Sequence, residues 1–357
     1  MPMKPRARRN GATLKDVAAE AGVSIAAASK VLHGRGSNIR VSPEKAENIQ
    51  TAARDLNYVP NSLAQSMRLG RTGAIGLVFE NFGRISGGPL FYVHLFDGVV
   101  GELFPKGYRL TVFPEIDPLS PLGIVSDGTV DGVVWCKLPE TPEFTEAAKQ
   151  SPVPIIALNS RPPDSPDHVT YVSCDNPGGS ALMVEHLTSL GHQRILFAME
   201  RREDKTPDAL SRLAGFEAAC KRMRVPFESD RDVVVWSQDA AELPLWLKER
   251  HPHTAIFAWN EGFGASVLRQ LLACGVRVPE EMSVAGFDST QYCDTLNPSL
   301  TAVRQPILEM ASYATRLLLE QIAQGRERRT PDVIFPCSLD VRESTGPAFQ
   351  RRAAVQP

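Results

Sequence analysis

The stretch Thr13-Leu-Lys-Asp-Val-Ala-Ala-Glu-Ala-Gly-Val-Ser24 carries the clearest structural signal in this chain of 357 residues. A hydroxyl residue, Thr13, stands three places before an acid, which is the pattern of a capping box at a helix start. Apolar residues at 14, 17, 18 and 21 give that helix one apolar face. Gly22 accepts a positive φ and predicts the helix end, and Ser24 predicts the cap of a second helix over 25–32. Two helices around so short a turn predict a helix-turn-helix.

The residues that follow complete a small helical unit. Ser42-Pro43-Glu44 supplies a cap, a proline at the first helical position and an acid in the first turn of a third helix. Apolar residues at 46, 49, 53 and 56 give this helix its buried stripe. The run Asn57-Tyr-Val-Pro60 ends the helix, because a residue before proline avoids the α region. Asn61 then predicts the cap of a short segment over 62–67, and basic residues and glycines form a linker up to residue 73.

The net charge of −2 conceals two oppositely charged parts. Residues 1–71 hold 12 Lys and Arg against 5 Asp and Glu, a balance of +7, and the rest holds 27 against 36, a balance of −9. A basic arm on an acidic body is typical of a protein whose head contacts phosphate. A solvated basic tail would give the same charges, so charge alone does not decide between the two.

The composition narrows the class of protein. A hydrophobic content of 43% with 22% charged residues is typical of a globular protein, and the apolar runs are too short to cross a bilayer. No secretory signal follows the basic N-terminus, so we expect a cytoplasmic protein with no membrane partner. The 6 cysteines have no paired or metal-like spacing, which favours reduced thiols. We expect no cofactor and no metal site, and we interpret His251 and His253, which flank Pro252, as a solvated cluster in preference to a metal pair.

From residue 74 short apolar runs alternate with amphipathic stretches. The runs predict buried strands at 75–79, 109–113, 132–136, 153–158, 195–199, 233–236, 255–258 and 284–287. The amphipathic stretches predict helices at 90–105, 178–190, 210–223 and 262–274. Alternation of this kind indicates parallel sheets covered by helices on both faces, and this many strands favour two doubly wound lobes. The predicted fold class is α/β: an all-α helix-turn-helix headpiece plus a two-lobed core, with a ligand site at the carboxyl ends of the strands, between the lobes.

Residues 12–18 and 21–24, followed by Asn57-Tyr-Val-Pro-Asn-Ser-Leu-Ala-Gln-Ser-Met67, resemble the headpiece and hinge of the lactose-repressor family of transcriptional regulators. The likeness continues through the core, at 215–216, 259–261, 284–288, 300–306 and 341–346. The family core is itself similar to periplasmic sugar-binding proteins. The resemblance therefore implies a DNA-binding head joined to a core that binds a small molecule.

The resemblance implies the following domains. Residues 1–60 form the helix-turn-helix headpiece, 61–73 the hinge helix and linker, and 347–357 a disordered tail. The effector-binding core, 74–346, divides into discontinuous lobes of 74–175 plus 304–331 and of 176–303 plus 332–346. Three crossings between lobes suit hinge closure around a ligand.

In the resembled family the second helix lies in the major groove and the hinge enters the minor groove. The DNA-binding residues implied for this chain are Thr13, Ser24, Ile25, Ala26, Ala27, Ser29, Lys30, His33, Asn38, Arg40, Tyr58, Asn61, Ser62, Ala64 and Met67.

The second helix departs from the family pattern, because it reads Ile-Ala-Ala-Ala-Ser-Lys over 25–30 where hydroxyl and amide side chains are usual. Ile25 and Ala26 are expected to touch thymine methyl groups, and Lys30 to reach guanine acceptors. Ala28 fits simple packing, and Ala27 also allows that interpretation. Met67 stands where the family places a leucine wedge. We therefore expect modest base discrimination.

By likeness to sugar-responsive members, Arg212, Asn260 and Asp288 match positions that hydrogen-bond effector hydroxyls. A guanidinium, an amide and a carboxylate grip vicinal hydroxyls with matched donors and acceptors. Further effector-binding candidates by position are Glu80, Asn159 and Gln305, with Trp236 or Phe91 stacking on a sugar face. Three of these residues also have purely structural interpretations. Asn260 fits a helix cap, Asp288 a turn and Trp236 the core.

We interpret the chain as a homodimeric regulator, a repressor that binds a pseudo-palindromic double-stranded operator in the bacterial nucleoid. A small-molecule effector, a sugar or sugar derivative, is expected to control its operator affinity. Two alternatives stay open: a sugar-binding receptor, which needs a signal peptide and no headpiece, and an α/β enzyme acting on a sugar-like substrate. No phosphate-loop, dinucleotide, zinc-protease or esterase motif occurs in the sequence, so we assign no catalytic residue.

Overall fold

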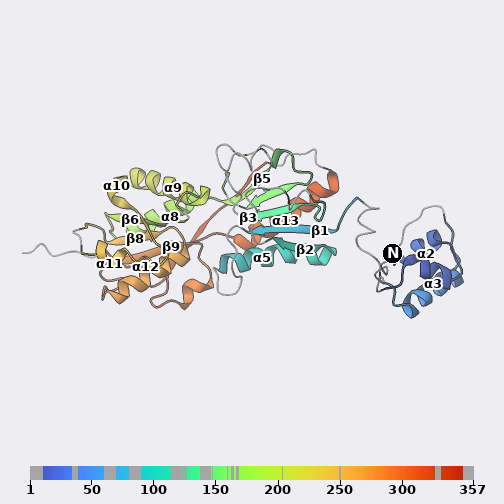
Figure 1. Ribbon diagram of the computed structural model, residues 1–357. Coiled ribbons are helices and arrows are strands. Elements are labelled where there is room, and N and C mark those ends of the chain that lie inside the picture. The colour runs from blue at the N-terminus through green and yellow to red at the C-terminus, as the bar shows by residue number, and fades with distance from the viewer. Residues whose placement is uncertain are drawn as a thin grey trace, which may run out of the picture. The chain divides into compact units, whose positions relative to one another are not determined.

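The structure is a computed structural model in two compact units, residues 1–72 and 73–357 (Figure 1). It describes residues 11–33, 39–59, 70–79, 90–113, 123, 127–136, 146, 148–158, 160–161, 165, 169–202, 204–248, 251–325 and 331–348.

The first unit contains three helices in its described part: α1 (Leu14–Glu20), α2 (Ile25–His33) and α3 (Pro43–Asp55). The predicted capping box is confirmed, because Thr13 Oγ1 accepts from the Asp16 amide and the Asp16 carboxylate accepts from the Thr13 amide. The hydrogen bond from the Thr13 side chain lowers the pKa of Asp16. Gly22 has φ +63°, as its place after α1 requires.

The core of this unit is small and apolar. Val17, Ala18, Ala28, Ile49 and Ala52 are its buried members, and they come from all three helices. Partly buried side chains such as Leu14, Leu32 and Leu56 close it. The helix-turn-helix predicted from residues 13–24 is therefore part of a three-helix unit with its own packed core.

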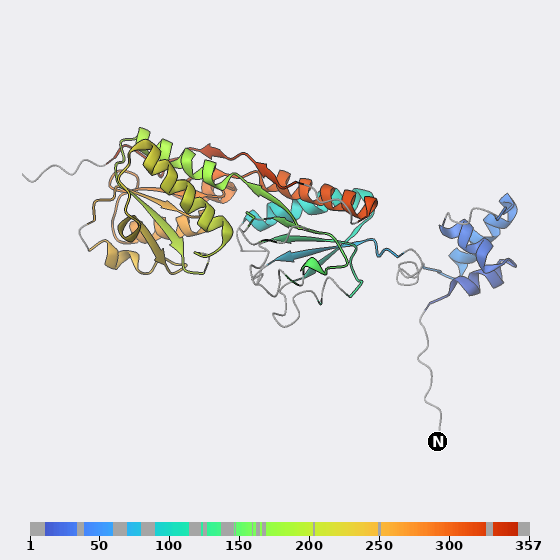
Figure 2. The same ribbon diagram turned by 90° about the horizontal axis from the view of Figure 1, so that it is seen from above.

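The first lobe of the second unit is a six-stranded sheet in the order β11-β5-β4-β3-β1-β2, with every pairing parallel. Its elements are β1 (Ala74–Phe79), α5 (Leu90–Leu103), η1 (Phe104–Lys106), β2 (Arg109–Phe113), β3 (Val133–Cys136), β4 (Ile155–Leu158), β5 (Thr170–Cys174), α13 (Ile307–Gln324) and β11 (Val333–Phe335). Helices α5 and α13 lie side by side (Figure 2). A Cβ at Gly98 would lie 2.5 Å from the Leu308 carbonyl oxygen, so this close approach requires glycine.

The second lobe is another six-stranded sheet, in the order β12-β10-β9-β8-β6-β7, in which only the β10–β12 pairing is antiparallel. Its elements are α8 (Asn176–Ser189), β6 (Ile195–Glu200), α9 (Pro207–Met223), α10 (Ser229–Asp232), β7 (Val233–Trp236), α11 (Leu243–Trp246), β8 (Ala255–Ala258), α12 (Glu261–Ala273), β9 (Ser283–Phe287), η2 (Gln291–Thr295), β10 (Thr301–Arg304) and β12 (Ser338–Asp340). Figure 1 shows α8 and α9 on one face of this sheet and α12 on the other. The predicted fold class is confirmed.

The chain crosses between the two sheets after β5, after β10 and between β11 and β12. The last crossing was predicted at 331–332, and that position is wrong. Val333–Phe335 pairs with β5 of the first sheet, in the register Val333↔Val172, before the chain returns to the second sheet as β12. The chain leaves the first sheet at 336–337, between β11 and β12, and strands of only three residues give too short a pattern to assign them to a sheet.

The interpretation of His251 and His253 as a solvated cluster is also wrong. His253 is buried, with Nε2 2.8 Å from Asp232 Oδ1, and burial lowers its pKa although Asp232 opposes the shift. His251 stacks on Trp246, with ring centroids 3.8 Å apart. Among the residues that the structure describes, no group of three or more His, Cys, Asp or Glu is arranged to hold a metal ion. In the same residues, no helix has both the length and the apolar character of a membrane span.

Candidate DNA interface and ligand site

The N-terminal half of α2 forms an open face on the headpiece. Ser24, Ile25 and Ala26 are exposed, Ala27 is half-buried, and Ile25 retains 49% of its accessible surface. The Ser24 hydroxyl accepts from the Ala27 amide at 3.2 Å, which caps the helix and sets its direction. Ala28 is fully buried, so its packing interpretation is correct. The exposure of Ile25 and Ala26 leaves both side chains open for the predicted contacts with thymine methyl groups.

Two of the implied DNA contacts differ from expectation. Ser29 is only 8% exposed and is one of the buried residues of α2, so the DNA contact assigned to it stays a prediction. The Lys30 ammonium donates to the carbonyl oxygen of Ile39, tying α2 to the chain just before α3. An ammonium has three donors, so two remain for a base or a phosphate.

We expect Lys30→Ala to weaken operator binding by about 1–3 kcal/mol and to relax discrimination at one base pair in each half-site. Lys30 is a long polar side chain on α2, whose N-terminal half otherwise offers only small or aliphatic side chains. Fluorescence anisotropy on specific and random duplexes measures both effects, with Lys45→Ala on α3 as the charge-matched control. Equal losses on the two duplexes would show that Lys30 only contacts phosphate or only supports the fold.

The other implied DNA contacts lie elsewhere in the headpiece or outside the described residues. Thr13 caps α1, Arg40 is exposed, and His33 and Tyr58 have ring centroids 6.5 Å apart. The residues outside the described part of the chain are Asn38, Asn61, Ser62, Ala64 and Met67. The predicted hinge contacts therefore stay predictions.

In the core, Arg212 is the centre of a buried polar cluster. Its side chain is 4% exposed, and it donates from Nε to Asn176 Oδ1 at 2.7 Å, from Nη1 to the Trp259 carbonyl at 2.7 Å and from Nη2 to Asp288 Oδ1 at 2.8 Å. The guanidinium carbon lies 3.8 Å from the centroid of the Phe287 ring. These bonds use three of five N–H donors, so two remain for a ligand.

Asp288 joins this cluster to Gln305. Its Oδ1 accepts from Gln305 Nε2 at 2.6 Å as well as from Arg212. Among the described residues its Oδ2 accepts no hydrogen bond, although the side chain is only 12% exposed. Asp288 has φ +82°, a strained conformation for a residue with a Cβ, at the carboxyl end of β9. Arg212 and Asp288, from the predicted set, therefore lie together with Gln305, a further candidate, and effector binding by these residues stays a prediction.

The packing of α8 against α9 sets the position of Arg212. A Cβ at Gly215 would lie 2.3 Å from Pro177 Cα, so only glycine allows this approach. Pro177 follows Asn176, the residue that receives Arg212 Nε. In the sequence Arg212-Leu-Ala-Gly-Phe, the glycine therefore lies one helical turn after the arginine. It allows the close packing of α9 on α8 that brings Arg212 within hydrogen-bonding distance of Asn176.

The electrostatics keep this guanidinium charged. Burial acts against the charge and is the largest single influence, but Asp288 and Asp208 outweigh it and the pKa of Arg212 is raised. A buried cation of this kind is stable only while its carboxylate partners are in place. The cluster is therefore a preorganised group of charges rather than a surface ion pair.

Sequence reasoning missed the residues that connect this cluster to the first lobe. Asn176 is 1% exposed and donates from Nδ2 to Ser160 Oγ and to Asp208 Oδ1, each at 2.9 Å. Asp208 Oδ1 also accepts from the Ser160 amide at 2.8 Å. Ser160 follows β4 of the first lobe, so these bonds cross between the lobes. The only sequence signal near Asn176 is the helix start Asp175-Asn176-Pro177. That signal predicts a helix cap and gives no sign that Asn176 connects several side chains.

Of the remaining effector candidates, one caps a helix, two pack against aromatic neighbours, and two lie outside the described residues. Asn260 Oδ1 accepts from the Phe263 amide at 2.7 Å, so the capping interpretation is correct for that oxygen. Trp236 is 5% exposed and meets Trp246 edge-on, so its core interpretation holds and sugar stacking on it is wrong. Phe91 packs edge-on against Tyr92 on α5. Glu80 and Asn159 lie outside the described residues.

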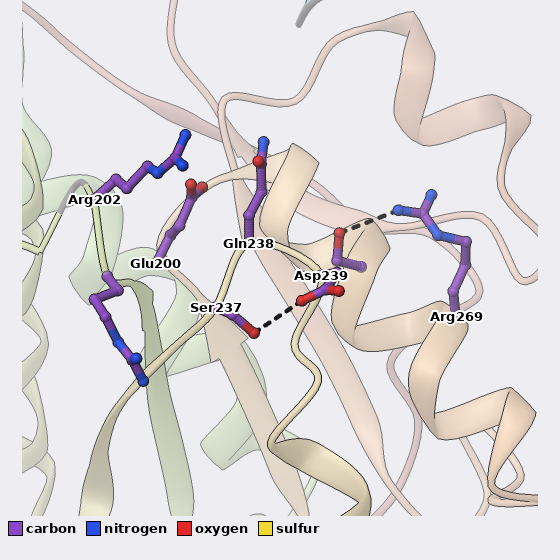
Figure 3. A pocket seen from close by; sticks show the side chains of 8 residues that line it. Glu200, Arg202, Ser237, Gln238, Asp239 and Arg269 are labelled. Atoms are coloured by element: carbon purple, nitrogen blue, oxygen red, sulfur yellow. Dashed lines mark hydrogen bonds between the residues drawn. The ribbon is translucent and has the colours of Figure 1, made fainter.

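A polar pocket of about 610 Å³ opens at the carboxyl ends of β6 and β7 (Figure 3). It is formed by the chain just after β6, the chain just after β7 and helix α12. Arg212 and Asp288 do not line it, although they stand at the same edge of the sheet. Its lining residues are Glu200, Arg201, Arg202, Ser237, Gln238, Asp239, Ser266 and Arg269.

Comparison with known families matches both units. The lacI family of bacterial regulatory proteins matches residues 13–61, and the periplasmic binding protein-like domain matches residues 184–345. The transcriptional regulator CelR of Thermobifida fusca is 30% identical over 349 residues, covering 94% of this chain and 99% of CelR. The ribose operon repressor of Halalkalibacterium halodurans is 29% identical, covering 93% of this chain and 97% of that protein.

Solved structures show the same architecture. A CelR–cellobiose complex has a TM-score of 0.69 at 28% identity, covering 93% of this chain and 99% of that chain. The lac repressor dimer bound to operator and an anti-inducer has a TM-score of 0.77, covering 94% and 100%, and at 23% identity it shows the fold alone.

A helix-turn-helix headpiece on a two-lobed α/β core defines a DNA-binding transcriptional regulator. The chain belongs to the lacI family of bacterial regulatory proteins. The relatives reported above are regulators of transcription and not enzymes.

Proposed function

We propose that this regulator is a repressor whose operator affinity is set by a carbohydrate bound at the Arg212–Asp288–Gln305 cluster. The observation that carries the proposal is the Asp288 carboxylate, which has one oxygen held by Arg212 and Gln305 and one that no described residue bonds. A buried acceptor beside spare guanidinium donors matches a pair of vicinal hydroxyls. Relatives crystallised with cellobiose and with ribose support this choice of ligand class.

We also propose that the protein acts as a homodimer and that it acts on DNA in the bacterial cytoplasm. A homodimer presents two headpieces to the two halves of a pseudo-palindromic operator, since one second helix reads few base pairs. The proposed place of action is the bacterial cytoplasm, on nucleoid DNA. The hinge residues Asn61, Ser62, Ala64 and Met67 are proposed to enter the minor groove, and Glu80 and Asn159 to complete the ligand site from the first lobe.

A thermal-shift screen against neutral sugars and sugar phosphates tests the ligand class. A sugar at 100 times its Kd adds about 2.7 kcal/mol to the free energy of unfolding, so the unfolding transition of the core moves up by several degrees. Asp288→Asn should abolish the shift because it replaces an acceptor by a donor. Arg202→Ala, in the neighbouring pocket, shows whether that pocket belongs to the same site. No shift with any sugar would contradict the proposal.

A further inference from the structure

Two cysteines lie together where the chain crosses between the lobes. Cys174 is the last residue of β5, immediately before the first crossing, and Cys337 lies in the third crossing, between β11 and β12. β5 and β11 are parallel neighbours, with Cys174 opposite Phe335, two residues before Cys337. Both cysteines are free thiols.

Their contacts place the two thiols side by side. The Cys337 thiol donates to the Asp175 carbonyl at 3.4 Å, and the Cys174 thiol donates to Asn176 Oδ1 at 3.4 Å. Thus each thiol bonds to one of the two residues that follow Cys174. A hydrogen bond with the Cys337 thiol and burial together raise the pKa of Cys174 well above its usual value. Cys174 is 4% exposed, whereas Cys337 is only partly buried.

We propose that Cys174 and Cys337 form a reversible disulfide when the protein meets hydrogen peroxide, and that this bond ties the first crossing to the third. Cys337, the more accessible thiol, loses its proton and its sulfur attacks a peroxide oxygen. The O–O bond breaks, water leaves, and Cys337 becomes a sulfenic acid. The Cys174 sulfur then attacks the Cys337 sulfur, the S–O bond breaks and a second water leaves. The peroxide is reduced by two electrons and the thiol pair is oxidised, and an added dithiol reverses the change.

The position of the bond gives it a consequence for the regulator. The crossings are the segments that bend when one lobe rotates on the other, so a covalent tie between two of them restrains closure. The Cys174 thiol also donates a hydrogen bond to Asn176 Oδ1, the same oxygen that accepts from Arg212 Nε. Oxidation removes that donor next to the proposed ligand site. The oxidised protein is therefore expected to melt at a higher temperature and to respond less to ligand, the second effect resting on the proposed function.

The test treats the folded, full-length chain with hydrogen peroxide, blocks remaining thiols and maps peptides by mass spectrometry. The expected product is a Cys174–Cys337 cross-linked peptide, lighter by about 2 Da than the two free peptides and separated by dithiothreitol. Cys337→Ser and Cys174→Ser should each abolish it, whereas Cys274→Ser, at an exposed thiol, should leave it in place. A sulfinic acid on Cys337 without the cross-link, or a cross-link through Cys274 instead, would overturn the proposal.

A second measurement tests whether the disulfide restrains the crossings, independently of whether it forms, and it needs no ligand. The unfolding temperature of peroxide-treated wild type should exceed that of the reduced protein, and Cys337→Ser should show no such rise. A cross-link that forms without raising the unfolding temperature would overturn the claim that it restrains the crossings. Because peptide mapping and melting are done without sugar or DNA, both can succeed even when the sugar screen fails.

Discussion

Arg212→Ala should lower the free energy of unfolding of the core by about 3–5 kcal/mol and abolish ligand binding. The substitution leaves the Asp288 carboxylate buried without its cation, removes the donors to Asn176 and the Trp259 carbonyl, and opens a space over the Phe287 ring. Removing one partner of a buried charge pair lowers the free energy of unfolding by more than the intact pair contributes to it, because the remaining charge is left buried and unpaired. Urea unfolding followed by circular dichroism measures this loss.

Arg222→Ala provides the matched control, because Arg222 lies on the same helix, α9, and also pairs with an acid. Its bond to Glu185 is 2.9 Å long, but the two side chains are 56% and 49% exposed. Solvent screening limits an exposed pair to about 1 kcal/mol or less. Similar losses for Arg222→Ala and Arg212→Ala would show that the cluster is not the buried, preorganised site described above.

A chain that begins at Gly73 should lose all specific operator binding while keeping its ligand-induced thermal shift. The headpiece and the core are separate compact units that divide at residues 72 and 73, and residues 1–71 carry the basic excess. Binding of the full-length chain should weaken steeply as salt rises, because Lys and Arg release counterions condensed on DNA. Electrophoretic mobility shift at several salt concentrations measures both properties.

The full-length chain, tested in parallel with the same ligand and the same duplex, is the control for the truncation. Specific binding by the truncated chain would place DNA recognition in the core and overturn the assignment of the headpiece. Loss of the thermal shift together with operator binding would instead show that the core needs the headpiece in order to fold.

Much of the fold was predictable because short-range patterns encode it. The eight apolar runs became strands and the capping signals at Thr13, Ser24 and Ser42 became helix starts. The elements that escaped prediction, such as β5, β10, β11, β12 and α13, are of two kinds. The strands are short, at three to five residues. Polar residues dilute the apolar pattern of β5, β10 and β12, and β11, although it reads Val-Ile-Phe, has only three residues. Helix α13 lies beyond the last predicted strand and has no side-chain cap to mark its start.

The site was predicted less completely, for a physical reason. Arg212, Asp288 and Gln305 were found through family likeness, and the sequence alone does not tell a ligand-facing polar residue from one that serves the fold. Asn260 and Trp236 show this, since one caps α12 and the other packs into the core. Asn176 was missed because its bonds to Ser160, Asp208 and Arg212 reach partners 16 to 36 positions away. Such long-range hydrogen bonds leave no local pattern.

DNA binding under the control of a small molecule is the central property proposed for this protein. The most direct measurement is an anisotropy titration of the full-length protein on a duplex selected from a random library. It is made without ligand and with the sugar that gives the largest thermal shift. We expect the affinity for the selected duplex to change by at least about five-fold with saturating sugar, because coupling of this kind typically amounts to 1–3 kcal/mol. Binding to a scrambled duplex should stay weak throughout. An unchanged affinity for the selected duplex at saturating sugar would contradict the account.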